Sequence, residues 1–418
     1  AAAAPFADAC AAPYAVEPHA RCSFGGYVDG FDLREVLGNP AMGSRLRKDM
    51  AKYRLLVFRG QEKMTGPEHI ALSEMLGSMD HGLHKVHPRA EDPRLLRVSN
   101  DADQGFVQTG TSGWHVDGVM LKAPFAAQTM HHLSAIPGGD TLFLGLAELL
   151  EALEPEEAER LGRTWFVSGV GDVRRDGQLS LLPLVYQHPF TGAETMCFHL
   201  GQGYCLGWIE ERPRGSGLAG LVDGLVGGSP GPCGQTLKRL LLQSADDDRD
   251  FAVLPPGPIQ RLLKKAISTL GPGARERAVL RQEWRTGDLA LLDNMALAHL
   301  PTPGTQAPPE GHGSPGLRLF HRTTMVDPAA EPRSLRGAAS VLLAGPGAAL
   351  DGVRAGAVED PDAMRVILDG LTAAGGGGAA SAKPKPPVKK DAPEQRKAMA
   401  SRLRRKSQAG LEQRRLAQ

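Results

Sequence analysis

Trp114-His115-Val116-Asp117 is the stretch that decides the fold, together with Asp293-Asn294-Met295-Ala296-Leu297-Ala298-His299 far downstream. Two histidines and one carboxylate form the ligand set that holds non-haem Fe(II) on one face and leaves the other positions open. On a strand, His115 and Asp117 point to the same face because the side-chain period is two. Both can then bind one metal ion, which His299 reaches from elsewhere in the fold. The pattern predicts an iron enzyme.

An arginine pair, Arg318 and Arg322, follows the last histidine. A guanidinium group offers a bidentate fork that matches a carboxylate. An arginine placed deep in a protein needs an opposite charge. The pair therefore indicates a co-substrate that carries a carboxylate.

The composition is that of an ordinary globular protein, with 41% hydrophobic and 23% charged residues among 418. That length allows about two to three folded units. The chain has 51 glycines and 32 prolines, which indicates many turns and loops. Its five cysteines are scattered and form no CxxC pair, which argues against a disulfide framework or a zinc site and favours a reducing compartment.

The charge of the chain is unevenly distributed. Residues 383–418 carry a net charge of +9, which leaves −8 for the remainder of a chain whose total is +1. Residues 328–382 are rich in alanine and glycine and contain Gly375-Gly376-Gly377-Gly378, a composition typical of a linker. We therefore predict a catalytic domain at residues 14–327, a linker at 328–382, and a basic, disordered tail at 383–418.

Strand and helix signals alternate within the predicted catalytic domain. Thr65-Gly66-Pro67-Glu68 has the form of a capping box and predicts a helix that ends at Gly77. A second helix is expected over 147–161, and strands over 55–58, 126–133, 141–144, 279–284, 289–293 and 317–326. Two stretches, 201–258 and 301–316, resemble insertions and lack the periodicity of a core. Many strands with metal ligands on them predict an α+β, mainly β fold with a double-stranded β-helix (jelly-roll) core and flanking helices.

Several motifs occur in a fixed order along this domain. After Trp114-His115-x-Asp117 come Pro137-Gly138-Gly139-Asp140-Thr141-Leu142, His188-Pro189-x-Thr191-Gly192, Gly287-Asp288-x-Ala290-x-x-Asp293-Asn294, and Arg318-x-x-His321-Arg322. In this order, they make the chain resemble the taurine/2,4-dichlorophenoxyacetate dioxygenase family (TauD/TfdA), which are Fe(II)- and 2-oxoglutarate-dependent oxygenases. The resemblance covers most of residues 14–327.

The resemblance implies a role for individual residues. His115, Asp117 and His299 would bind Fe(II) and form the catalytic centre. Thr141 and Arg318 would bind 2-oxoglutarate, with Arg318 paired to its distal carboxylate.

Substrate contacts are also implied by the resemblance. Arg322 would contact the substrate where taurine-oxidising members hold a sulfonate, and His84 falls near another substrate-contacting histidine. The reaction implied is hydroxylation of a small anionic substrate by O2, with release of succinate and CO2 and support from ascorbate. Taurine or another sulfonate is the leading candidate.

The chain departs from the family at Gly110-Thr111-Ser112-Gly113, where taurine-oxidising relatives have an asparagine, and in its two long insertions. Structural explanations stand beside the functional ones. Arg322 fits a structural ion pair equally well, and Thr141 fits a backbone hydrogen bond in a turn. Adjacent His131 and His132 point to opposite faces of a strand and cannot chelate one ion together. We interpret these two, with His188, His199 and His321, as structural residues or as neighbours of the ligands.

Two other functions use the same ligands. A metal-dependent hydrolase needs no 2-oxoglutarate, so it would stay active without Arg318. A catalytically silent barrel would act through its tail, and deletion of residues 383–418 would abolish its function.

The expected partner is a small molecule, not a membrane, because no apolar stretch is long enough to span a bilayer. Nucleic acid is not expected, since the tail has no interleaved aromatic residues. The alternatives left open are an acidic partner for the tail and a homo-oligomer. A cytoplasmic location is expected, with an N-terminal targeting segment as the alternative.

Overall fold

The computed structural model describes residues 13–79, 86–121, 124–170, 178–201, 204–213, 249–310 and 314–327, and also residues 332, 356–357 and 369. All of them lie in the first of two units of the chain, Ala1–Gly375, and not in Gly376–Gln418. The predicted tail and nearly all of the predicted linker are therefore outside the described residues. So is His84.

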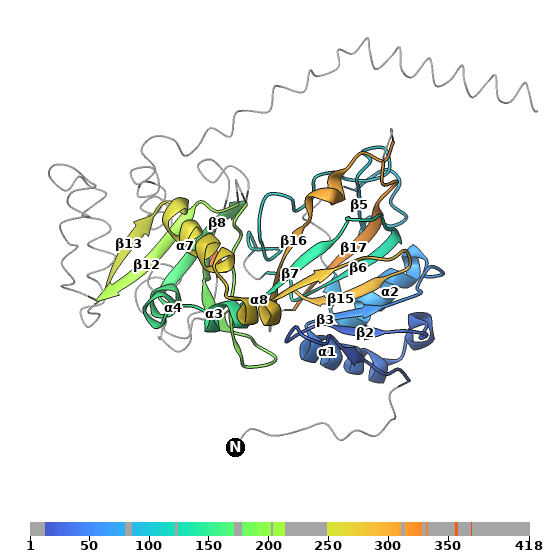
Figure 1. Cartoon of the computed structure of the whole chain (residues 1–418), viewed down its shortest axis with the longest axis horizontal. Helices are drawn as coiled ribbons and strands as arrows, with labels where there is room; N and C mark the ends of the chain where they lie inside the picture. Colours follow the sequence, from blue (N-terminus) through green and yellow to red (C-terminus); the bar gives the residue numbers. More distant parts are fainter. Residues whose placement is uncertain are drawn as a thin grey trace, which may run out of the picture. The chain divides into compact units, whose positions relative to one another are not determined.

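A large mixed sheet and a small antiparallel sheet form one part of the fold, and most of their strands are labelled in Figure 1. The order of the large sheet is β1 (Glu17–Pro18), β2 (Gly26–Val28), β3 (Leu55–Phe58), β15 (Leu289–Asp293), β6 (Ala127–Ser134), β17 (Leu319–Val326) and β4 (Ser78–Met79), with β5 (Leu96–Ser99) on β17. The order of the small sheet is β14 (Val279–Gln282), β7 (Thr141–Gly145) and β16 (Leu297–Pro301).

A second set of strands lies outside this framework. It comprises β13 (Arg249–Leu254), β12 (Gly207–Pro213), β8 (Thr164–Val170), β9 (Gln178–Pro183) and β18 (Gly356–Ala357), and the hairpin of β10 (Val185–Gln187) and β11 (Glu194–Met196). The helices are η1 (Leu33–Val36), α1 (Pro40–Tyr53), α2 (Gly66–Leu76), α3 (Leu146–Glu151), α4 (Pro155–Gly162), α7 (Pro256–Ser268), α8 (Pro272–Ala278) and η2 (Pro303–Gln306). The result is a mixed fold with many strands and few helices. None of the described helices is long and apolar enough to cross a bilayer.

Strands β6 and β17 pair side by side and present two different faces. Met130 and Phe320 pack into one apolar cluster with Phe143 of β7 and Leu297 of β16, so this inner face looks toward the small sheet. The opposite, outer face packs on α1 and α2, whose buried side chains share a cluster with residues of the large sheet. Because side chains alternate along a strand, neighbouring residues of β6 meet entirely different surroundings.

The sequence correctly predicted α2 and most of the central strands. The Thr65 side chain accepts a hydrogen bond from the Glu68 backbone N–H, and the Glu68 carboxylate accepts one from the Thr65 backbone N–H, so both halves of the capping box form. Strands β3 and β15 have the predicted bounds.

Two sequence predictions about the fold were wrong. The helix expected over 147–161 is two helices, α3 and α4, because Pro155 lacks the N–H that a continuous helix requires and instead starts the second helix. The stretch 201–258 was not expected to contribute to a core. Its strand β12 nevertheless pairs with β8 and buries Trp208 and Ile209 completely, so part of the predicted insertion is core.

Candidate metal centre

His115 and Asp117 lie in a short extended segment that belongs to none of the named strands. His115 forms isolated antiparallel bridges with His199 on one side and with His299 of β16 on the other. The backbone N–H of His115 donates to the carbonyl of His299 at 3.2 Å, and that of His299 donates back at 2.9 Å. The predicted strand is therefore only a bridged segment, but the pairing still brings the downstream histidine beside the upstream pair.

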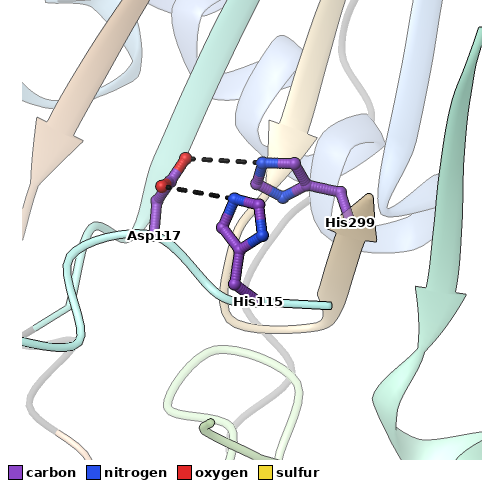
Figure 2. Close-up of side chains that lie close together, drawn as sticks. All are labelled: His115, Asp117 and His299. Atoms are coloured by element: carbon purple, nitrogen blue, oxygen red, sulfur yellow. Dashed lines mark ion pairs between the residues drawn. The ribbon is translucent and has the colours of Figure 1, made fainter. Parts of the chain in front are cut away.

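The three predicted ligands converge, as Figure 2 shows. One nitrogen of each histidine and one carboxylate oxygen all lie within 4.8 Å of one another. His115 Nε2 is 3.7 Å from Asp117 Oδ1, and His299 Nε2 is 3.5 Å from Asp117 Oδ2. No other such group of histidine, cysteine and carboxylate side chains occurs in the part of the chain that the structure describes.

The ring orientation of His115 leaves its Nε2 atom free for a metal. Nδ1 lies 2.7 Å from the Gly113 carbonyl, which can only accept a hydrogen bond, so Nδ1 carries the proton. Such an N–H to carbonyl contact is the usual support for a metal-binding imidazole. Burial, followed by the nearby His299, lowers the pKa of His115 to about 3, so the ring is neutral at physiological pH, as a ligand must be.

Asp117 is held by three neighbouring side chains. Gln128 of β6 donates to Oδ2 at 3.0 Å, and Arg322 of β17 donates to the same oxygen at 2.7 Å. Asn294 fixes the backbone of Asp117, accepting from its N–H and donating to its carbonyl. Burial disfavours the charged carboxylate, but Arg322 and the two histidines outweigh it and hold the pKa of Asp117 well below its usual value.

These residues fit a divalent transition metal. Two imidazoles and one carboxylate on one side of a point are the donor set of non-haem Fe(II) sites. Gly110 approaches the same point: it has a φ of +72°, and an added Cβ would lie 3.2 Å from His115 Nε2. A side chain there would crowd the metal-facing nitrogen. Glycine at this departure from the family pattern therefore keeps the space beside the ligand open.

Arg318 is buried, with 3% of its surface exposed. Its backbone is fixed by Asn100, whose Oδ1 accepts from the Arg318 N–H at 2.8 Å. Its Nε atom has no partner among the described residues, and burial alone lowers the pKa of the guanidinium to about 10, with no described acid opposing the shift. A buried cation without a counter-charge is costly, so the site suits an anionic ligand.

Thr141 and Arg322 each contact another protein side chain in this structure. The Oγ1 atom of Thr141 accepts a hydrogen bond from Trp284 Nε1 at 3.0 Å, which leaves its own O–H proton available to a ligand. Arg322 forms the ion pair with Asp117 described above, so its contact in this structure is a candidate metal ligand. Its Nε atom is buried and has no partner among the described residues.

Sequence reasoning missed Gln128, since nothing in the sequence distinguishes it from other polar strand residues. His188 was interpreted as structural, and the structure gives the reason. Its Nε2–H donates to Asp293 at 3.0 Å, and its Nδ1 accepts from the backbone of Phe190 and Thr191. The His-Pro-x-Thr-Gly motif thus anchors the β10–β11 turn to the strand that leads to His299.

Comparisons with known proteins agree with this geometry. Residues 15–324 match the family model described as "Taurine catabolism dioxygenase TauD, TfdA family". The chain is 26% identical to pentalenolactone F synthase of Streptomyces arenae over 286 residues, which are 63% of this chain and 86% of that protein. Two solved structures from Burkholderia xenovorans share the fold.

The first is described as a putative alpha-ketoglutarate-dependent taurine dioxygenase. It has a TM-score of 0.54 and 20% identity, and the match covers 83% of this chain and 98% of that one. The second is described as a taurine dioxygenase. It has a TM-score of 0.52 and 20% identity, and the match covers 85% of this chain and 98% of that one.

Proposed function

The chain belongs to the TauD/TfdA dioxygenase family, whose members are 2-oxoglutarate-dependent oxidoreductases, and from this premise we propose its reaction and its substrate class. It hydroxylates a small anionic substrate with Fe(II), 2-oxoglutarate and O2, and releases succinate and CO2. Taurine or another sulfonate is the leading candidate. We interpret the large and small sheets as the double-stranded β-helix core of such an enzyme.

One observation carries the proposal: Arg318 is buried, its Nε atom has no partner among the described residues and no described acid pairs with it, in a chain whose fold also brings together two histidines and one carboxylate. A hydrolase with the same ligands has no use for a second, buried anion site. A dicarboxylate that binds the metal at one end and Arg318 at the other satisfies both features. The Thr141 hydroxyl would donate to the same distal carboxylate.

Bound Fe(II) supplies the O2 chemistry that side chains lack. The protein residues position and shield the reactants. His115, Asp117 and His299 hold the metal from one side, and Gln128 and Asn294 keep the carboxylate oriented.

Arg322 is proposed to bind the anionic group of the substrate. Its guanidinium contacts Asp117 at 2.7 Å, so it lies beside any molecule bound at the metal. An anionic substrate also compensates the positive charge of a buried arginine. The name of one relative, pentalenolactone F synthase, shows that other substrates occur among related proteins, and the test must therefore include non-sulfonates.

The experiment measures succinate formed from 2-oxoglutarate with Fe(II), ascorbate and O2, across taurine, other sulfonates, sulfate esters, phenoxyacetates and simple carboxylates. His115→Ala is expected to abolish turnover. His19→Ala is the matched control, because His19 lies in the β1–β2 loop and bonds only local backbone. Stimulation by taurine or another sulfonate supports the proposal. Stimulation only by a non-sulfonate would replace the substrate class, and metal binding with no succinate formation would favour the hydrolase or the silent barrel.

The remaining expectations stay predictions of the sequence. These are support by ascorbate, a cytoplasmic location, substrate contact by His84, the domain bounds, and an acidic partner for the tail. Activity of a chain shortened to residues 1–382 would test the tail directly, because a silent barrel that acts through its tail would lose its function.

A further inference from the structure

A third histidine lies in the same row as the two ligand histidines. The segment around His115 pairs with the segment around His199: Val116 N–H donates to the Phe198 carbonyl at 3.0 Å, and Leu200 N–H donates to the Trp114 carbonyl at 2.8 Å. His199 and His299 are thus direct cross-strand neighbours of His115. Residues directly opposite each other on paired strands project to the same face. All three histidines therefore point toward the metal side.

The ring of His199 is fixed in position. It stacks on His115 with centroids 4.8 Å apart, and on Tyr204 with centroids 4.0 Å apart. The Gly201 backbone N–H donates to its Nδ1 at 3.0 Å, so Nδ1 bears the lone pair and Nε2 carries the proton of the neutral ring. Among the described residues, no protein acceptor is bonded to this Nε2–H. His199 is also not part of the three-residue ligand group.

His199 and the proposed co-substrate contact Thr141 lie on opposite sides of the ligand histidines, so His199 is placed to contact the substrate. The paired segments run in the order β7, β16, the His115 segment and the His199 segment. Thr141, the proposed co-substrate contact, begins β7 at one side of this row. Three strand spacings of about 4.8 Å separate that strand from His199. The free N–H of His199 therefore lies across the ligand histidines from the co-substrate pocket.

We infer that His199 is a specificity-determining residue of this centre, whose Nε2–H donates a hydrogen bond to an anionic oxygen of the substrate. The inference rests on the proposed function and deepens it. Part of the Arg322 charge is already compensated by the ion pair with Asp117. An anionic substrate therefore needs a second hydrogen-bond donor besides Arg322. A fixed N–H on a stacked, immobile ring supplies that donor with little loss of conformational entropy.

Two variants separate this role from packing. His199→Phe keeps an aromatic ring between His115 and Tyr204 but removes the donor, while His199→Gln restores an N–H donor without the ring. With taurine, or the panel compound that most stimulates succinate formation, His199→Phe should raise substrate KM roughly ten- to hundredfold, as expected for a lost hydrogen bond to a charged group. His199→Gln should recover part of that loss.

Binding measurements without O2 give a readout that does not depend on turnover. Fe(II) and 2-oxoglutarate should bind His199→Phe as tightly as wild type, while the compound used in the kinetic test should bind more weakly to the variant loaded with both. The ratio of hydroxylated product to succinate should also fall, because a misplaced substrate lets 2-oxoglutarate be consumed unproductively.

Two results would overturn the inference alone: unchanged substrate KM and binding in His199→Phe, or an equal weakening of Fe(II) binding, which would make His199 a support for the metal site. A wild-type protein that neither binds nor turns over any panel compound would overturn the proposed function, and the inference with it.

Discussion

The two faces of the β6–β17 pair differ in whether their buried polar groups have hydrogen-bond partners within the protein. His131 and His321 lie on the outer face, and His69 of α2 packs against it. Each has a partner within the protein: His69 Nε2 bonds Thr129, His131 donates to the Gln61 carbonyl, and His321 accepts from Arg97, while His69 Nδ1 has no partner among the described residues. On the inner face, both ring nitrogens of His132 and the Nε atoms of Arg318 and Arg322 have none among the described residues.

This difference separates structure from function within a single pair of strands. Buried polar groups are normally hydrogen-bonded because an unmade bond costs free energy. A face on which several buried polar groups have no protein partner is therefore suited to a ligand that supplies the missing hydrogen bonds. The outer face is covered by α2 and contributes stability, whereas in the proposed function the unpaired groups of the inner face point toward the metal, the co-substrate and the substrate.

The largest expected effect comes from an inner arginine compared with an outer one. Arg318→Met should raise the KM for 2-oxoglutarate about a hundredfold, since losing one partner of a buried charge pair costs about 2–5 kcal/mol. Without co-substrate, the variant should unfold at a temperature no lower than wild type, because a buried unpaired charge is removed. Steady-state kinetics and thermal unfolding measure both effects.

Arg97→Met is the matched control, because Arg97 bonds His321 and the Gln104 carbonyl on the outer side. It should change stability and leave the KM for 2-oxoglutarate unaltered. Equal KM values for Arg318→Met and wild type would show that the inner guanidinium does not bind the co-substrate.

The next comparison uses adjacent residues of β6. Gln128 lies on the inner face and donates to Asp117, while Thr129 lies on the outer face and bonds His69. Gln128→Leu should weaken Fe(II) binding about 10- to 100-fold, the usual cost of losing a group that orients a metal ligand. Thr129→Val should lower the melting temperature and leave Fe(II) affinity unchanged. Anaerobic titration with Fe(II) tests both variants, and similar affinities would contradict the division between the faces.

The sequence was sufficient to predict which three side chains converge, because the chemistry of a metal site is encoded in residue type and order. His115, Asp117 and His299 meet as expected, and the alternation of His131 and His132 between two faces is confirmed by their different contacts. Local signals with a direct physical cause, such as the capping box of α2, were also reliable.

What the sequence could not predict depends on long-range pairing. Gln128 contacts Asp117 only because β6 packs beside the ligand segment, and His199 joins the histidine row only because two short bridges form. The strand β12 was missed because its burial comes from pairing with β8, not from its own periodicity. The ion pair of Arg322 with Asp117 likewise requires the register of β17 against β6.

A smaller effect is expected from pH, because His115 and His321 both change the free energy of unfolding gradually as the pH falls. Burial lowers the pKa of inner His115 to about 3 and of outer His321 to about 4, while an unfolded histidine titrates near 6.5. Between these values the unfolded chain binds more protons than the folded one, so stability falls as the pH falls from about 6.5 toward 4. Each histidine should contribute about 1 kcal/mol per pH unit below pH 6.

The two contributions can be separated by chemical denaturation at pH 7.5, 6.0 and 5.0. His321→Gln should reduce the acid sensitivity with or without metal, because the outer group is removed. Saturating Fe(II) should stabilise the protein by a similar amount at pH 5.0 and at pH 7.5, since His115 and Asp117 are already deprotonated in the folded protein at both values. Stability independent of pH across this range would mean that neither histidine is held neutral by burial.

The smallest expected effect compares the neighbours His132 and His131. His132 stacks between Trp284 and Phe320, with centroids 4.1 and 5.0 Å away, and neither of its ring nitrogens has a described partner. His132→Phe keeps the stacking and removes two unpaired polar atoms, so it should raise the free energy of unfolding by about 1 kcal/mol. His131→Phe loses the bond to the Gln61 carbonyl and should lower it by a similar amount. Urea denaturation of the pair measures both, and a destabilised His132→Phe would place His132 with the outer histidines, as a residue whose hydrogen bonds support the fold.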